Sequence, residues 1–234
     1  MLAQGWARLI ELLEGRPDTD PMTRVKHLCE LCVSVTGVTG AALAVASQEH
    51  RSTVFATDAV GGRLEDLQLT LAQGPTLDAL RIGRPVLVPD LADPAVSPWQ
   101  RFAPAAVESG AQAMFVLPVP VGATALGVLE LYRARAGGLS AEQSHDAQTL
   151  AGAAAVLLTE GNVKDTPETL SWAIDERSGF QREVHQAVGT TMSQLGVTAR
   201  EAFALICAHA FATSRPIREV ADDILADRLR LRAE

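Results

Sequence analysis

Hydrophobic periodicity changes along the length of this chain, and the change limits the folds that the chain can adopt. Alternating or β-branched runs typical of strands, such as TGAALAVAS (39–47) and AMFVLPVPV (113–121), occur only between residues 39 and 134. From Ser140 onward, the apolar residues recur at helical spacing alone. Strands mixed with helices, followed by helices only, predict an α+β domain with an all-α domain after it.

The α+β part contains about five strand patterns with helical patterns between them. The helical pattern from 63 to 83 is interrupted at Gly74-Pro75, and a capping box of Ser140 and Gln143 opens a long helix. The strands are expected at 39–47, 52–58, 85–91, 113–121 and 125–134. We divide the chain into an N-terminal amphipathic helix at 1–18, an α+β domain at 19–162, a linker at 163–173 and an all-α domain at 174–234.

Composition bounds the class of protein. With 47% apolar and 21% charged residues, the 234-residue chain has an ordinary globular composition and enough material for a core. No apolar run approaches the roughly 18 residues that cross a bilayer, and the start lacks the basic region of a signal peptide. Three cysteines do not make a disulfide framework. We expect a cytoplasmic protein with no membrane partner.

The charge of the chain argues against nucleic-acid binding. The formal net charge is −8, and residues 165–234 hold eight arginines against eleven aspartates and glutamates. Proteins that bind nucleic acids draw most of their affinity from neutralising phosphates. Such a function here requires the arginines to gather on one face, with Asp222, Asp223 and Asp227 turned away.

Three helices are expected in the all-α domain. Gly196 ends the first helix, and Thr198 with Glu201 forms a capping box for the second. Pro216 falls in the first turn of the third helix. Three helices of this size bury a modest core, close to the minimum for independent folding. Their apolar positions include Phe180, Val184, Ala187, Leu195, Phe203, Ile206, Ile217, Val220 and Ile224.

Three stretches of this domain resemble the ANTAR family, an RNA-binding module of bacterial transcription antitermination regulators. They are QAVG-x-x-M from Gln186 to Met192, LGVTAREAF (195–203) and ATSRPIREVADDI (212–224). The resemblance implies binding to RNA hairpins, usually in tandem in a leader transcript, that favours an antiterminator over a terminator. Many members carry Lys or Arg where this chain has Val188, and this departure removes one possible phosphate contact.

The RNA contacts expected from this resemblance lie on the first helix and around the start of the third. Small residues let a helix approach a partner closely, and arginines near a helix N-terminus favour a phosphate. The alternative is that the small residues only allow tight helix packing and that the arginines are solvated surface. The predicted RNA contacts are His185, Ala187, Gly189, Ser214, Arg215, Pro216 and Arg218.

The α+β domain resembles a GAF domain, a small-molecule sensing module, over residues 71–91, 97–133 and 139–158. The resemblance implies a GAF-like antiparallel sheet flanked by helices, with one face packed against the first and last helices and a ligand under short helices on the other. Apolar side chains line such sites well, although the same side chains also serve an ordinary core. The predicted ligand contacts are Phe55, Trp99, Phe102, Phe115, Leu117 and Leu129.

The sequence supports no particular ligand for the GAF-like domain. It lacks a phytochrome-like cysteine attachment and the motif of cyclic-nucleotide-binding GAF domains, so the ligand is an unknown small molecule and no cofactor is expected. Cys29 and Cys32 share one apolar helix face, and no second pair completes a zinc site, so no metal is expected. The sequence contains no pattern that pairs a nucleophile with a base, so no enzymatic activity is expected.

The two resemblances predict a cytoplasmic GAF–ANTAR regulator in which a sensed signal changes how the C-terminal helices meet RNA. A homodimer is expected because the alanine-rich helix at 140–159 carries small residues that let two helices pack closely. The alternative is a protein-interaction or dimerisation adaptor that binds no RNA. The net negative charge of the C-terminal helices favours that alternative.

Overall fold

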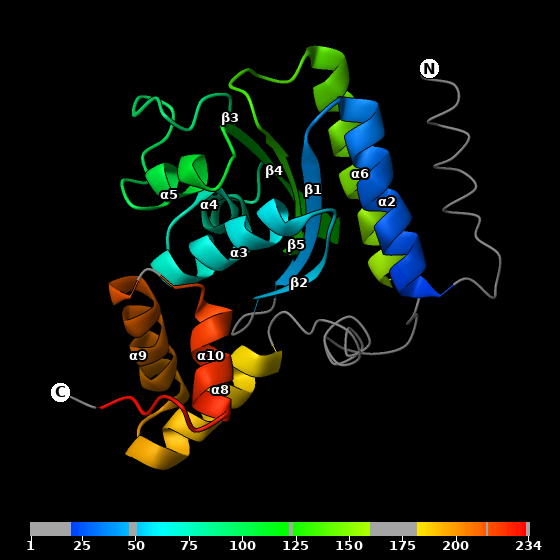
Figure 1. Cartoon of the computed structure of the whole chain (residues 1–234). Helices are drawn as coiled ribbons and strands as arrows, with labels where there is room; N and C mark the ends of the chain where they lie inside the picture. The colour runs from blue at the N-terminus through cyan, green and yellow to red at the C-terminus, as the bar shows by residue number, and fades with distance from the viewer. Residues whose placement is uncertain (1–19, 47–50, 122–123, 160–181, 214, 233–234) are drawn as a thin grey trace.

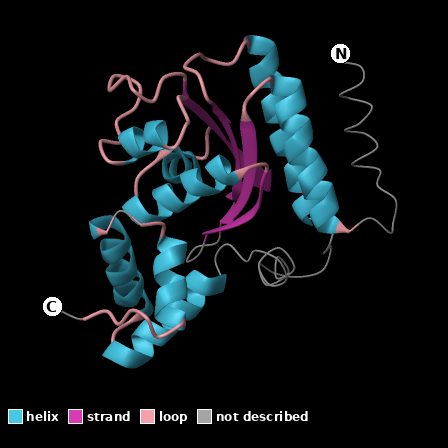
Figure 2. Ribbon diagram, in the orientation of Figure 1, coloured by secondary structure: helices cyan, strands magenta, loops and turns pink. Residues whose placement is uncertain are grey.

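The computed structural model describes residues 20–46, 51–121, 124–159, 182–213 and 215–232. The predicted helix at 1–18 and the predicted linker at 163–173 lie outside these ranges. The predicted fold class is confirmed, because an antiparallel sheet with helices on both faces is followed by helices alone (Figure 2).

The sheet contains five strands in the order β2-β1-β5-β4-β3, and every neighbouring pair is antiparallel. All five strand patterns form strands, although several described residues expected at their ends lie outside them, including Thr57, Asp58, Pro89, Asp90, Leu91 and Ala134. The strand expected at 85–91 shortens most, because Pro85 and Pro89 cannot donate a ladder hydrogen bond at its two ends. The strands are β1 (Gly40–Ala46), β2 (Arg51–Ala56), β3 (Val86–Val88), β4 (Ala113–Val121) and β5 (Thr124–Arg133).

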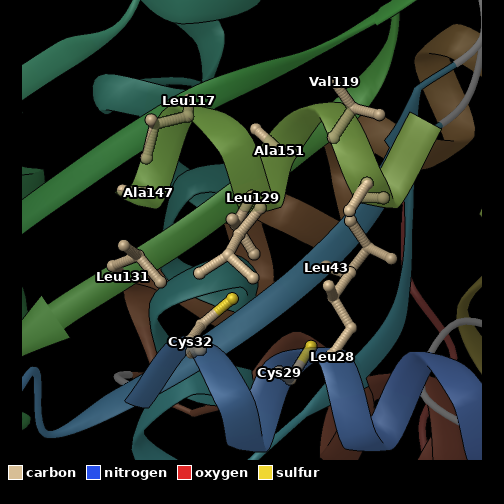
Figure 3. Close-up of a cluster of buried hydrophobic side chains, with 14 of the residues drawn as sticks. Leu28, Cys29, Cys32, Leu43, Leu117, Val119, Leu129, Leu131, Ala147 and Ala151 are labelled. Carbon is tan, nitrogen blue, oxygen red and sulfur yellow. The ribbon is translucent and has the colours of Figure 1, made fainter. Parts of the chain in front are cut away.

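One face of the sheet packs against helices α2 (Pro21–Thr36) and α6 (Ala141–Thr159) (Figure 1). The capping box at the start of α6 is confirmed, because the Gln143 N–H donates to the Ser140 hydroxyl oxygen at 3.1 Å and the Ser140 N–H donates to the Gln143 amide oxygen at 2.9 Å. Alternate residues of the central strands face these helices, among them Leu43, Leu117, Leu129 and Leu131 (Figure 3). Phe115 belongs to the same core. We call this side the α2/α6 face.

The opposite side, called the α3 face, lies under α3 (Ala59–Leu71), α4 (Pro75–Ile82) and α5 (Phe102–Glu108) (Figure 1). Asp58 begins α3 by accepting the Gly61 N–H at 2.9 Å, which is the usual role of an N-cap aspartate. Gly74 separates α3 from α4 with a φ of 142°, a conformation that favours glycine. The core of this face includes Leu64, Phe102, Met114, Val116 and Val128.

The C-terminal helices, called here the helical tail, are α8 (Arg182–Leu195), α9 (Ala199–Ala212) and α10 (Ile217–Leu225). Gly196 ends α8 with a φ of 67°, and the predicted capping box of Thr198 and Glu201 is present at the start of α9. Pro216 is the N-cap of α10, one position before the first turn in which the sequence placed it. Within the ranges given above, no helix has both the length and the apolar character needed to cross a bilayer.

Candidate nucleic-acid interface and sensor face

The helical tail has a small core to which all three helices contribute. Its fully buried members are Val184, Ala187, Ile206, Ala210, Ile217, Val220, Ala221 and Ile224. The methyl group of Ala187 is 0% exposed, so it packs the helices together and offers no surface to an outside molecule. For this predicted RNA contact the structure favours the packing alternative.

Gly189 lies two residues further along α8 and differs from Ala187 in its surroundings. It is exposed, and an added Cβ would meet no atom of the described residues within 4 Å. Packing inside the tail therefore does not require a glycine at this position. A glycine inside a helix costs about 0.5–1 kcal/mol relative to alanine, so close approach of an outside partner is a physical reason to keep it.

Arg215 is held in an ion-pair network at the start of α10. Its Nη2 donates to Asp223 Oδ2 at 2.7 Å, and its Nε lies 3.5 Å from Glu219 Oε2. Arg228 Nε donates to the second oxygen of Asp223 at 2.7 Å. The hydrogen bonds from Arg215 and Arg228 lower the pKa of Asp223. Carboxylates thus lie among the cations of this surface, and a phosphate must compete with Asp223 for Arg215.

Arg218 lies one turn from Arg215 at the start of α10 and acts on the α+β domain. Burial raises the pKa of Asp66 on α3 to about 7, with a further rise from Glu65, and the charges of Arg218 and Arg63 oppose that rise. The predicted RNA contact Arg218 therefore interacts electrostatically with Asp66 of α3.

Two further contacts join the tail to the α+β domain, where α9 and α10 lie against α3 (Figure 1). Leu69 of α3 packs against the tail core. The guanidinium carbon of Arg101, at the start of α5, lies 4.0 Å from the ring centroid of Phe211 on α9, within the range of a cation–π contact.

The structure brings together only part of the predicted RNA surface. Arg215, Pro216 and Arg218 are half-buried neighbours at the start of α10, and Gly189 is exposed on α8, the helix that α10 packs against. The His185 side chain and Ser214 lie outside what the structure describes.

The six predicted ligand contacts fall on opposite faces of the sheet. Trp99 and Phe102 lie on the α3 face, with ring centroids 6.3 Å apart in an edge-to-face arrangement. The other four predicted contacts lie on the α2/α6 face, namely Phe55, Phe115, Leu117 and Leu129. One ligand cannot contact both groups across the sheet, so a single site uses one group or the other.

A buried polar network on the α3 face was not anticipated from the sequence. Glu130 of the central strand β5 is 3% exposed, and its Oε1 accepts hydrogen bonds from Gln68 Nε2 at 3.2 Å and from the Thr76 hydroxyl. The Thr76 N–H donates to Gln68 Oε1 at 2.8 Å. The network joins α3, α4 and β5. Its sequence signal is the glutamate inside the apolar run ALGVLELYR, in register with Val128 and Tyr132 on the covered face.

The two cysteines of α2 are buried in the α2/α6 core (Figure 3). Burial raises the pKa of the Cys29 thiol to about 12, and burial also raises the pKa of Cys32. Buried thiols of this kind behave as small apolar side chains. No group of three or more histidine, cysteine, aspartate or glutamate residues suited to a metal ion occurs in the part of the chain that the structure describes.

Comparison with protein-family models gives two matches. The model of the GAF domain matches residues 18–159, and the model of the ANTAR domain matches residues 176–225. The first match contains the whole sheet and the helices on both of its faces, and the second contains α8 to α10. No curated protein matches the chain.

The solved structures similar to this chain include GAF domains of low sequence identity. The GAF domain of an Acinetobacter phosphoenolpyruvate-protein phosphotransferase is 11% identical with a TM-score of 0.53, and the alignment covers 70% of this chain and 98% of that one. The GAF domain of A. aeolicus nlh2 in an inactive state is 13% identical with a TM-score of 0.49, covering 68% of this chain and 96% of that one. At such low identities the similarity concerns the fold alone. The first structure, with its TM-score of 0.53, supports that shared fold.

Proposed function

The chain belongs to the GAF domain family and carries an ANTAR domain after it, and from this premise we propose a regulator of transcription antitermination that binds RNA hairpins through α8 to α10. A signal sensed by the GAF domain at residues 19–162 controls that binding. The observation that carries the proposal is the ANTAR match itself, which coincides with three helices that share a core.

The proposed RNA surface combines the exposed backbone of α8 at Gly189 with the start of α10 at Arg215, Pro216 and Arg218. Proteins recognise RNA hairpin loops by stacking, backbone contacts and shape, for which a bare glycine on a helix is suited. The free N–H groups at the start of α10 add to the attraction of a phosphate. His185 and Ser214 remain predicted contacts of the same surface, and Ala187 supports it from inside.

The affinity of one tail for RNA is expected to be modest. Asp223 and Glu219 already pair with Arg215, and a phosphate has to displace them. A homodimer places two tails on tandem hairpins and raises the overall affinity without any new contact. The exposed side of α6 suits pairing with a second copy, because Val156 is exposed there and an added Cβ at Gly152 would meet no described atom within 4 Å.

In this proposal the protein acts in the cytoplasm and does not catalyse a reaction. The signal is a small molecule that favours one arrangement of the tails through its differential affinity for two states of the GAF domain. This population shift changes how often the tails engage a nascent leader transcript.

The test is a titration of labelled tandem stem-loop RNAs with randomised loops against the full chain and an Arg215→Ala, Arg218→Ala double variant. The double variant is expected to lose affinity for the RNAs that the wild type selects. The matched control is an Arg84→Ala, Arg135→Ala double variant, which removes the same charge from exposed positions of the GAF domain. Equal affinity of wild type and the tail variant would reject the assigned surface.

A second candidate function is a protein-interaction adaptor, which the pairing of Arg215 with Asp223 and Glu219 favours. Salt distinguishes the two functions. Binding that neutralises phosphates weakens linearly in log affinity against log salt concentration, so the RNA function predicts a steep salt dependence from a low starting Kd. A protein partner bound through apolar surface predicts a shallow one.

A further inference from the structure

Helix α3 of the GAF domain contacts other parts of the molecule through two of its faces. Its inner face lies on the sheet, where buried Gln68 bonds to Glu130 and to the Thr76 backbone. Its outer face carries Asp66 and Leu69, and the ANTAR helices α9 and α10 lie against it (Figure 1). One helix therefore contacts both the interior of the GAF domain and the ANTAR domain.

The outer face of α3 offers the ANTAR domain chemistry that overlaps with that of RNA. Asp66 lies in the electrostatic field of Arg218, whose charge opposes the rise in the pKa of this carboxyl group. Next to it, Leu69 contributes apolar contact to the tail core. Arg101 covers one face of the Phe211 ring at 4.0 Å. An aromatic ring covered by a guanidinium cannot at the same time stack on that face with a nucleobase.

We propose that α3 and RNA compete for the same side of the ANTAR domain, so that the arrangement described here is the state that does not bind RNA. This inference rests on the proposed function and adds its regulation. RNA binding then requires α9 and α10 to separate from α3. The apparent affinity for RNA is reduced by the fraction of molecules in which the two domains have separated.

The network on the inner face connects the interior of the GAF domain to the helix that carries this contact. Gln68 packs directly against Gly74, where an added Cβ would clash with the Gln68 side chain. A molecule that takes over the hydrogen bonds of Glu130 has to displace Gln68, which is the residue next to Leu69 in α3. Gln68 therefore links the buried network to the helix whose outer face carries Leu69.

Two variants of the full chain test the competition from the GAF side, leaving the ANTAR sequence intact. Leu69→Gln removes apolar contact and is expected to tighten RNA binding about tenfold. Arg101→Ala removes the cation over Phe211 and is expected to tighten RNA binding about two- to fivefold. The second effect has an unusual sign, because losing a positive charge ordinarily weakens RNA binding.

Each variant has a matched control on the GAF surface away from the tail. Leu87→Gln changes an exposed leucine of the edge strand β3, and Arg84→Ala removes an exposed arginine of the preceding loop. Neither control is expected to tighten RNA binding. The probe is the same library of tandem stem-loop RNAs with randomised loops.

Domain separation is measured independently of RNA by the distance between spin labels attached through Glu108→Cys and Ala226→Cys, with Cys207 replaced by alanine. The proposal expects one short distance in the wild type and longer distances in both interface variants, together with tighter RNA binding. Domains that separate without tighter RNA binding would overturn it, as would wild-type domains that are already apart or interface variants that stay closed. Failure of the wild type and of the separated variants to bind any RNA would instead overturn the RNA function, and the inference with it.

Discussion

The GAF domain and the ANTAR domain differ in how completely each one closes its own core. The GAF domain buries large side chains on both faces of its sheet, including Phe102 and Phe115. The ANTAR domain has alanines at three of its eight fully buried core positions and takes an additional contact from Leu69 of the GAF domain. A small helical unit whose core is completed by its neighbour can therefore respond to changes in that neighbour.

The largest expected effect concerns the α2/α6 face of the GAF domain. Phe115→Ala is expected to lower the free energy of unfolding by about 3–5 kcal/mol, because it leaves a cavity in a core that α2 and α6 close. Urea unfolding of the full chain measures the loss, with Leu77→Ala at an exposed position as the control. A loss no larger than that of the control would mean that the GAF domain does not depend on this core.

A smaller effect concerns the interface itself and depends on pH. Because burial raises the pKa of Asp66 from 3.8 to about 7, the folded protein holds this proton more tightly than the unfolded chain does. The free energy of unfolding therefore falls as pH rises from 3.8 to about 7 and is level above that pH. The expected loss is on the order of 2 kcal/mol, less than the full shift would give because Asp66 is only half-buried.

The Asp66→Asn variant isolates this contribution, since it cannot ionise. Urea midpoints across the same pH range are expected to change less in the variant than in the wild type. Parallel pH profiles of the two proteins would show that Asp66 is solvated and that α3 is not covered by the ANTAR domain.

The next prediction concerns the capping box at the start of α9 in the ANTAR domain. Thr198→Ala removes the hydroxyl that accepts the Glu201 N–H at 3.3 Å, and it is expected to cost about 1 kcal/mol in the stability of α9. Thr198→Ser keeps the hydroxyl and is the control. Because α9 contacts α3, the spin-label distance is expected to broaden in the alanine variant alone. An unchanged distance would mean that docking does not depend on the stability of α9.

The smallest expected effect concerns Gly189 and shows whether this glycine serves helix packing or contact with a partner. Gly189→Ala is expected to stabilise the chain by about 0.5–1 kcal/mol, because the added methyl group has open space and alanine favours a helix. The same variant is expected to weaken RNA binding, which a titration measures. Unchanged RNA affinity would remove Gly189 from the proposed surface.

Local sequence signals predicted most of the fold. The capping boxes at Ser140 and Thr198 and the glycine stop at Gly196 all occur where their patterns predict them, because each depends on residues within one turn of the chain. The same locality explains why all five strand patterns were found.

The contacts that matter for regulation could not be predicted in this way. Gln68 and Glu130 are 62 residues apart in the sequence, and neither residue type marks a hydrogen bond at that distance. Leu69 fits the helical pattern of α3 equally well whether it covers the GAF domain or the tail. The predicted ligand contacts illustrate the same limit. Trp99 and Phe115 are both aromatic, and the sequence does not show that they lie on opposite faces of the sheet.

RNA is expected to meet the ANTAR helices on a surface that α3 covers at the start of α10. Photo-crosslinking of the Leu69→Gln chain to a selected stem-loop RNA carrying 4-thiouridine, followed by mass spectrometry of the peptides, tests it most directly. Crosslinks are expected at the start of α10 around Arg218, where α3 lies against the helix, and within α8 around the exposed Gly189, with fewer in the wild type at equal RNA concentration. Crosslinks confined to the GAF domain, or equal yields from the two chains, would contradict it.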